Sequence, residues 1–258
     1  MNLARNLLTR CRYCGAAYHG FQIQNNGDTV AARLMKAIKQ VTGEVSPTIG
    51  CSRTDAGVHA NEYYFNFHTD SKIPQERLPA ALNAYLPYDI AVTDCREVPE
   101  GFHARYNAVG KEYYYLIHNS PVRDPFCEKL KYHYRYPLDA EKLNWAARDF
   151  VGTHDFSAFC SAGSSVKDTV RTITYVSVER QGELVVFTVR GNGFLYNMVR
   201  IMAGTLIGIA EGRIGERDIP QIIESGERSR AGVTVPAHGL YLNRVFYQTR
   251  EFETITGR

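Results

Sequence analysis

The sequence is poor in closely spaced cysteines. Its six cysteines are scattered, at positions 11, 14, 51, 95, 127 and 160. Only Cys11 and Cys14 lie near each other, and a lone CxxC without a second pair is weak support for a zinc site. An extended segment would also point these two side chains to opposite faces. No secretory hydrophobic region precedes them. We therefore expect reduced thiols, no bound metal and a cytoplasmic location.

Long hydrophobic runs are also missing. The most apolar stretch, residues 194–210, contains Arg200 and two glycines, and it is shorter than the roughly 20 apolar residues of a membrane span. It predicts a buried helix. The chain has no Walker motif, no dinucleotide-binding fingerprint and no His/Cys cluster with metal spacing. These absences predict that the protein works without a cofactor.

An excess of one charge is absent too. Lys and Arg number 30 against 27 Asp and Glu, which gives a net charge of +3. A nucleic-acid partner would therefore have to bind through local clusters of basic residues. Aromatic residues are plentiful by contrast, with 17 Tyr and 12 Phe. We expect most of these rings to pack in strands and core, whereas a few could stack on unpaired RNA bases.

Periodic apolar positions place helices and strands in both halves of the chain. Helical spacing predicts a helix over residues 29–41, with Thr29 or Asp28 as its N-cap and Gly43 as its end. The other elements predicted are helices over 77–85, 140–150 and 194–210, an extended segment over 10–14, strands over 46–49, 62–68, 90–98, 111–118 and 240–247, and a hairpin of 171–179 with 184–190.

This order of elements predicts an α+β fold. We expect two similar α/β halves, residues 1–104 and 105–258, because each offers strands with about two helices and no flexible linker separates them. The halves are expected to share a continuous, largely antiparallel sheet with flanking helices. Its uncovered face would form the floor of a central active-site cleft.

Residues 50–60 form the most informative segment. Arg53 and Asp55 lie on a tight stretch between Gly50 and Gly57, directly before a predicted strand. Two residues apart in an extended stretch, their side chains face the same side, and a nearby guanidinium favours the ionised form of a carboxylate. On residue types alone, a structural aspartate that caps the turn is the stronger interpretation.

The exact order of residues in this segment favours a catalytic role. Residues 53–59, Arg-Thr-Asp-Ala-Gly-Val-His, resemble the catalytic loop of the TruA family of tRNA pseudouridine synthases, in which this pattern surrounds the essential aspartate. The resemblance runs along nearly the whole chain, through residues 13–22, 102–105, 111–115, 191–200 and 231–242. Ser52 replaces the family's usual Gly and Phe21 its usual Trp, which bears on target choice rather than on activity.

The resemblance implies the pseudouridine synthase fold and an isomerase. Its N-terminal half would carry the catalytic loop, and its C-terminal half would complete the uracil pocket and the surface for dimer and RNA contacts. The substrate would be uridine 38, 39 or 40 in the anticodon stem-loop of tRNA, and the enzyme a homodimer without cofactor or metal. Asp55 would open the glycosidic bond, as a nucleophile on the sugar or as a base at C2′.

Extrusion of the target base requires further residues. The resemblance implies that Arg53 fills the gap left in the RNA and that Tyr113 packs on the flipped base. A buried strand residue is the alternative role for Tyr113, and Tyr114 and Tyr115 are expected to play it.

Arg200 is the only charge in residues 194–210, and helical spacing aligns it with Gly204 and Gly208. The glycines would let another backbone approach closely. A buried guanidinium requires a carboxylate partner, and Asp55 is the obvious candidate. A guanidinium that reaches solvent at the helix edge is the alternative.

Several further residues complete the expected site. Leu240 or its neighbours would line the uracil pocket, and Arg105 and Lys111 would contact phosphates in a salt-dependent way. His19 and His59 are expected to make structural hydrogen bonds. Two other functions compete with the isomerase: a non-catalytic RNA-binding protein on the same scaffold, and a metal hydrolase, which the lack of a second acidic ligand near Asp55 disfavours.

Overall fold

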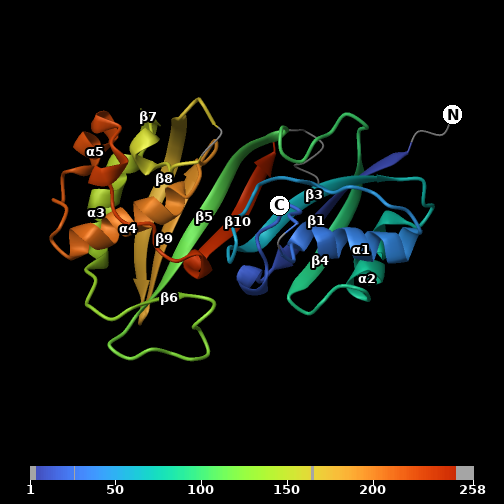
Figure 1. The fold of residues 1–258 in the computed structure, drawn as a ribbon, viewed down its shortest axis with the longest axis horizontal. Coiled ribbons are helices and arrows are strands. Elements are labelled where there is room, and N and C mark those ends of the chain that lie inside the picture. The colour runs from blue at the N-terminus through green and yellow to red at the C-terminus, as the bar shows by residue number, and fades with distance from the viewer. Residues whose placement is uncertain (1–3, 26, 164–165, 248–258) are drawn as a thin grey trace. The chain divides into compact units, whose positions relative to one another are not determined.

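The chain folds into two compact units. The computed structural model describes residues 4–25, 27–163 and 166–247. The first unit contains the described residues up to Val109 together with those from Leu242 onward, and the second contains the described part of Gly110–Tyr241 (Figure 1).

Antiparallel strands form the sheet of the first unit. Strand β1 (Arg5–Tyr13) lies between β3 (His59–Thr69) and β4 (Ile90–Val98), and the short β2 (Ile49–Gly50) pairs with β3. The unit also contains the helices α1 (Val30–Thr42) and α2 (Leu78–Asn83) and the 3-10 turns Gly15–Ala17 and Gln75–Arg77. Its fully buried side chains include Leu7, Leu34, Ile38, Phe65 and Phe67.

Helix α1 shows why this part of the fold could be predicted. The Thr29 hydroxyl accepts a hydrogen bond from the Ala32 N–H at 3.3 Å and so caps the first turn. Gly43 ends the helix in the left-handed region, at φ 79°. The apolar stripe through Leu34 and Ile38 is buried. The predicted helix over 29–41 is thus confirmed to within a residue at each end.

Strands also form the framework of the second unit. Strand β9 (Leu184–Gly191) pairs antiparallel with β5 (Ala108–Asn119) and β8 (Val170–Gln181), and β8 pairs with β7 (Gly152–Asp155). The short β6 (Tyr132–Tyr134) pairs parallel to β5. Helices and 3-10 turns complete the unit: α3 (Ala140–Ala147), α4 (Met198–Ala210), α5 (Ile219–Ser225), Arg148–Phe150, Ser157–Phe159, Arg228–Arg230 and Ala237–Gly239.

The apolar helix of the second unit begins later than predicted. Asn197 has a φ of 59°, so the backbone turns left-handed there and α4 starts at Met198 instead of residue 194. The predicted close approach at the glycines is confirmed at Gly204, where a Cβ would lie 1.8 Å from the Val233 carbonyl oxygen. A Cβ on Gly208 would meet the side chain of Ile214 instead.

The end of the chain belongs to the first unit. Strand β10 (Leu240–Tyr247) has the predicted bounds, but its residues from Leu242 onward lie with the first unit. There the Asn61 amide donates to Asn243 Oδ1 at 3.2 Å, and the Tyr247 hydroxyl donates to the Ala104 carbonyl at 2.7 Å. The second unit thus keeps only Leu240 and Tyr241 of this strand, and the division between the units falls after Val109, whereas the predicted halves were residues 1–104 and 105–258.

The predicted α+β class is confirmed. The strand pairs within the two units are antiparallel apart from β5 with β6. Strands β6 and β7 and helix α5 were not expected from the sequence pattern. Among the described residues, none of the helices combines the length and apolar character that a membrane span requires.

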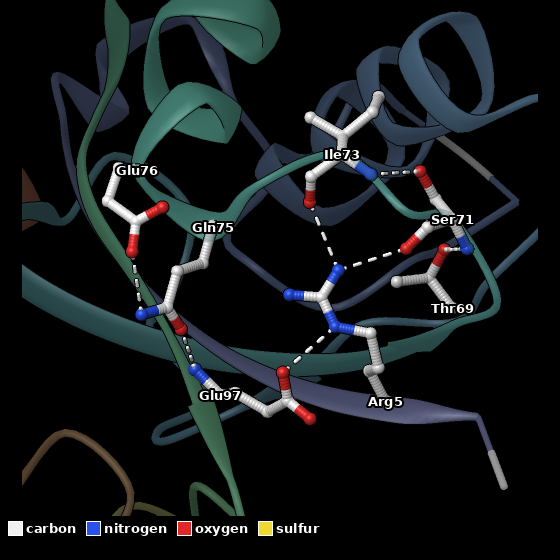
Figure 2. A network of polar contacts seen from close by, with 7 residues as sticks. All are labelled: Arg5, Thr69, Ser71, Ile73, Gln75, Glu76 and Glu97. Carbon is white, nitrogen blue, oxygen red and sulfur yellow. Dashed lines mark hydrogen bonds and ion pairs between the residues drawn. The ribbon is translucent and has the colours of Figure 1, made fainter.

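A polar network joins the start of β1 to the segment after β3 (Figure 2). The Arg5 guanidinium donates to the carbonyls of Ser71 and Ile73 at 2.9 and 3.0 Å, and its Nε lies 2.9 Å from the Glu97 carboxylate. The Gln75 side chain accepts from the Glu97 N–H at 2.6 Å. One arginine thus organises the loop that follows β3.

We expect Arg5→Ala to lower the free energy of unfolding by about 2 kcal/mol, because two carbonyls and a carboxylate lose a charged donor. Urea unfolding measures the change. Arg10→Ala is the matched control, since Arg10 lies on the same strand and its Nε donates to the Thr93 hydroxyl in an exposed bond. Equal losses in the two variants would contradict the role given to Arg5.

Candidate active site

Hydrogen bonds to its main chain hold the segment that carries Asp55 in place. It connects β2 to β3, and the Cys51 N–H donates to the Tyr64 carbonyl at 2.8 Å. The Tyr63 hydroxyl donates to the Ser52 carbonyl. Among the described non-glycine residues only Asn197 has a positive φ, so Ser52 occupies a conformation open to any residue. Serine in place of glycine therefore does not strain this loop.

Thr54 anchors the middle of the loop. Its side chain is buried, and its hydroxyl lies 2.8 Å from the Tyr13 hydroxyl. Its carbonyl accepts from the Phe21 N–H at 3.2 Å. On either side of it, Arg53 is exposed and Asp55 is half-buried, which agrees with the alternation expected of an extended stretch.

Gly20 lets the opening turn of the chain lie directly on this loop. Its φ is 86°, and a Cβ there would lie 2.4 Å from the Thr54 carbonyl oxygen. Its neighbour Phe21 stacks on Tyr63 with ring centroids 4.3 Å apart. The aromatic ring after Gly20 therefore packs against Tyr63, which holds the loop, and Phe takes this place where the family usually has Trp.

The turn after Asp55 is closed by main-chain bonds. The Val58 N–H donates to the Asp55 carbonyl at 3.2 Å, with Gly57 at φ 79° between them. The Gly57 N–H donates to the Tyr18 carbonyl, also at 3.2 Å. These bonds place Asp55 at the corner of a rigid turn at the start of β3.

The two histidines of the matched motifs differ in their surroundings. The His59 ring is buried, and its Nδ1 accepts from the Gly15 N–H at 3.1 Å. The predicted hydrogen-bonding role of His59 is therefore confirmed. His19 is exposed, and its main chain bonds to Asp28 and Gln24.

The three consecutive tyrosines of β5 have different surroundings. Tyr113 is 7% exposed, and its ring meets the edge of Phe194 at 5.0 Å. Tyr115 is fully buried and donates to the Pro236 carbonyl at 2.7 Å, as its expected core role requires. Tyr114 was expected to be buried but is only half-buried, because its side chain lies on the opposite face of β5 from Tyr115, where it stacks on Tyr241 at 5.0 Å.

Arg200 lies in the first turn of α4 and is half-buried rather than buried. Its Nε donates to the Val235 carbonyl at 2.7 Å, and its Nη1 donates to Asn197 Oδ1 at 2.6 Å. Asn197 thus has two roles that the sequence did not reveal. It turns the chain into the helix, and it orients the Arg200 guanidinium.

The segment before β10 gathers around Arg200 and Tyr115. Leu240 is buried at the start of β10, and a Cβ on the preceding Gly239 would lie 2.6 Å from the Tyr115 ring. Burial raises the pKa of the Tyr115 hydroxyl, Tyr132 adds to this rise, and the Arg200 charge opposes it. Tyr115 and the segment of Val235 to Leu240 thus form one packed group with Arg200.

Arg105 and Lys111 flank the boundary between the units. Arg105 is exposed, with its guanidinium carbon 6.0 Å from the Tyr106 ring centroid. Lys111 is half-buried opposite Gly191 on β9. The first unit therefore carries Arg53, Asp55 and Arg105, and the second carries Lys111, Tyr113, Arg200 and Leu240. That these two groups meet in one cleft stays a prediction.

Burial, aided by the Arg200 cation, lowers the pKa of His238 below its ordinary 6.5, against an opposing effect of Glu128. The unfolded chain then binds more protons than the folded chain as pH falls through this range, so the free energy of unfolding decreases. We expect His238→Gln to weaken this loss between pH 7.5 and 5.5, measured by urea unfolding. An unchanged pH dependence would contradict the shift.

Other parts of the described chain offer no stronger site. No group of three His, Cys, Asp or Glu side chains suited to a metal is found among the described residues. A cavity of about 510 Å³ lies in the second unit, among residues of β7, α5 and their neighbouring turns, and contains none of the predicted site residues.

Comparison with known proteins decides the family. The family model described as tRNA pseudouridine synthase matches residues 11–107 and 146–248. Over 243 residues, 94% of this chain and 100% of the relative, the sequence is 51% identical to tRNA pseudouridine synthase A of Acetivibrio thermocellus. The same protein of Clostridium kluyveri is 45% identical over the same shares. The chain belongs to the tRNA pseudouridine synthase family.

Membership in the tRNA pseudouridine synthase family makes the chain an isomerase of uridine in tRNA, as the resemblance implied. The first matched range contains Arg53 and Asp55, and the second contains Arg200 and Leu240. Among solved structures, the H/ACA ribonucleoprotein bound to a substrate RNA containing 2′-deoxyuridine has a chain with a TM-score of 0.40 and 12% identity. The match covers 93% of this chain and 49% of that one.

Proposed function

We propose that this chain converts uridine to pseudouridine at position 38, 39 or 40 of the tRNA anticodon stem-loop, with Asp55 as its catalytic residue and without a cofactor. The observation that carries the proposal is the placement of Asp55. It lies half-buried at the corner of a turn that Gly57 closes and that Gly20 supports, within the matched Arg-Thr-Asp-Ala-Gly-Val-His segment.

The chemistry requires one ionised carboxylate. The C1′–N1 bond of uridine breaks, the uracil turns, and a C1′–C5 bond forms, after which C5 loses its proton and N1 gains one. The product is an isomer, so no electrons are gained or lost. Asp55 acts on the sugar either as a nucleophile at C1′ or as a base at C2′, and both roles need a carboxylate held rigidly at the reacting atoms.

The remaining predicted residues bind and orient the substrate. Arg53, exposed beside Asp55, occupies the space left by the extruded base. Tyr113 packs on the flipped uracil and Leu240 lines its pocket. Arg200, whose guanidinium is already oriented by Val235 and Asn197, is the cation that we propose for this carboxylate, because a nearby guanidinium favours the ionised form.

Binding of the whole tRNA needs a larger surface. Arg105 and Lys111 contact phosphates, so the affinity falls as salt rises. The protein acts as a homodimer in the cytoplasm, with no membrane partner. Sedimentation of the free protein tests the oligomeric state independently of activity.

Mapping of pseudouridine in unmodified tRNA transcripts tests the proposal. The wild-type protein is incubated with folded transcripts and a chelator, and pseudouridine is located by carbodiimide adducts that stop primer extension. Stops at positions 38, 39 or 40 are expected. Tight tRNA binding without any stop would favour the RNA-binding scaffold, and stops elsewhere would correct the target.

A further inference from the structure

The turn between α2 and β4 exposes two tyrosines. Tyr88 is fully exposed, at 111% of its reference area, and Tyr85 is 58% exposed. The large rings of the sheet beside them, such as Tyr63 and Phe65, are buried. Two exposed aromatic rings only three residues apart in the chain make this turn a candidate contact site.

This turn is rigid although it is exposed. The Ile90 N–H donates to the Pro87 carbonyl at 3.1 Å and closes the turn around Tyr88 and Asp89. The Cys14 N–H donates to the Asp89 carbonyl at 2.8 Å. The Asn83 side chain both donates to and accepts from the main chain of Val92, at 2.8 and 2.7 Å. The main chain of this turn is therefore already ordered, and a tyrosine side chain has only two rotatable bonds to fix when it binds a partner.

The turn emerges at the same end of the sheet as the loop of Asp55. Tyr13, at the end of β1, pairs with Ile90 at the start of β4 and with Ala60 near the start of β3. The loops that precede β3 and β4 therefore leave the sheet at one edge.

Tyr18 connects the two loops directly. Its hydroxyl donates to the Asp89 carboxylate at 2.5 Å, and its carbonyl accepts from the Gly57 N–H at 3.2 Å. Burial, the hydrogen bond and the Asp89 charge raise the pKa of Tyr18, so its hydroxyl keeps its proton and remains the donor. A ring next to Asp89 is thus held in a defined position relative to the turn of Asp55.

We propose that Tyr88, with Tyr85 beside it, is a stacking platform for an unpaired base of the tRNA near the target uridine. The inference rests on the proposed function, which supplies the RNA. The anticodon loop offers unpaired bases, and stacking on an exposed ring accepts any base because every base has a π-face. Tyr88 is a positioning residue that holds the RNA while Asp55 reacts.

The series Tyr88→Phe, Tyr88→Leu and Tyr88→Ala separates ring stacking from general apolar contact. Loss of one stacked base is worth about 1–3 kcal/mol, so we expect Tyr88→Ala and Tyr88→Leu to raise KM for the transcript roughly 5- to 150-fold. Tyr88→Phe should retain the wild-type KM, and kcat should change little in all three. Because the side chain is exposed, the melting temperature should stay unchanged.

Val45→Ala is the surface control. Val45 is 71% exposed just beyond the end of α1. Its neighbour Glu44 accepts a hydrogen bond from the Thr69 hydroxyl, and Thr69 pairs with Arg5 at the end of the sheet opposite to the Asp55 loop. Val45 therefore lies away from the proposed platform. The KM and kcat of Val45→Ala should match those of wild type.

Three results would overturn the platform. They are a wild-type KM in Tyr88→Ala, a wild-type KM in Tyr88→Leu alone, and dissociation of a protein dimer by Tyr88→Ala in the absence of RNA. If wild type formed no pseudouridine, the proposed function would fail by itself. The dissociation constants of the same variants for the transcript would then still decide whether Tyr88 stacks on RNA.

Discussion

Asp55→Asn is expected to reduce pseudouridine formation at least about 1,000-fold, the scale seen when an enzyme loses its central catalytic group. Asparagine has nearly the shape of aspartate, and the bond that closes the turn uses the Asp55 main-chain carbonyl. The loop should therefore keep its conformation while the nucleophile or base is lost. Single-turnover formation of pseudouridine in a tRNA transcript measures the effect.

Binding and stability serve as controls for this variant. The dissociation constant for tRNA and the melting temperature should stay close to those of wild type, because Asp55 is half-buried in a turn that other residues hold. A large loss of stability would point to a structural aspartate, which is the stronger interpretation on residue types alone. Activity close to wild type would exclude Asp55 from the reaction.

Gly20→Ala is expected to reduce kcat about 100-fold, because a displacement of the reacting group by 1 Å can cost that much. The new Cβ would lie 2.4 Å from the Thr54 carbonyl oxygen and 3.2 Å from the Asp55 carbonyl carbon. The neighbour is backbone and not a flexible side chain, so the loop itself must move. Turnover of a tRNA transcript at saturation measures the effect.

Gly43→Ala is the matched control for Gly20→Ala. Gly43 has nearly the same φ, 79° against 86°, but a Cβ there would meet nothing within 4 Å. Both variants carry the conformational cost of a left-handed alanine, about 1–2 kcal/mol. Only Gly20→Ala should also reduce kcat. Equal activity in the two variants would contradict the support that Gly20 gives to the Asp55 loop.

Local signals made much of the fold predictable. Helix α1 carries both of its end signals, Thr29 and Gly43, and β4 and β10 were predicted with the bounds they have. The start of α4 was missed because asparagine enters the left-handed region only in particular contexts, and no pattern marks Asn197 as one of them. Strand β7 has only four residues, too few for periodicity to reveal.

The candidate site was predictable where its residues are neighbours in the chain. Arg53 and Asp55 belong to one short motif, so seven consecutive residues could signal them. The parts that hold the motif come from elsewhere in the chain, from Gly20 and Tyr18 of the opening segment. Arg200 is likewise oriented by a residue outside any predicted motif role, Asn197 of the same unit. Which of these contacts forms depends on tertiary packing, and a single sequence carries no direct record of it.

Release of tritium from a tRNA transcript labelled at C5 of its uridines most directly tests whether this chain is an isomerase that acts through Asp55. A new bond at C5 expels the hydrogen that C5 carried, so wild type should release tritium in proportion to the pseudouridine formed, without added metal or nucleotide. Asp55→Ala should release none above background. Equal release by both proteins, or by neither while both bind tRNA, would contradict the mechanism.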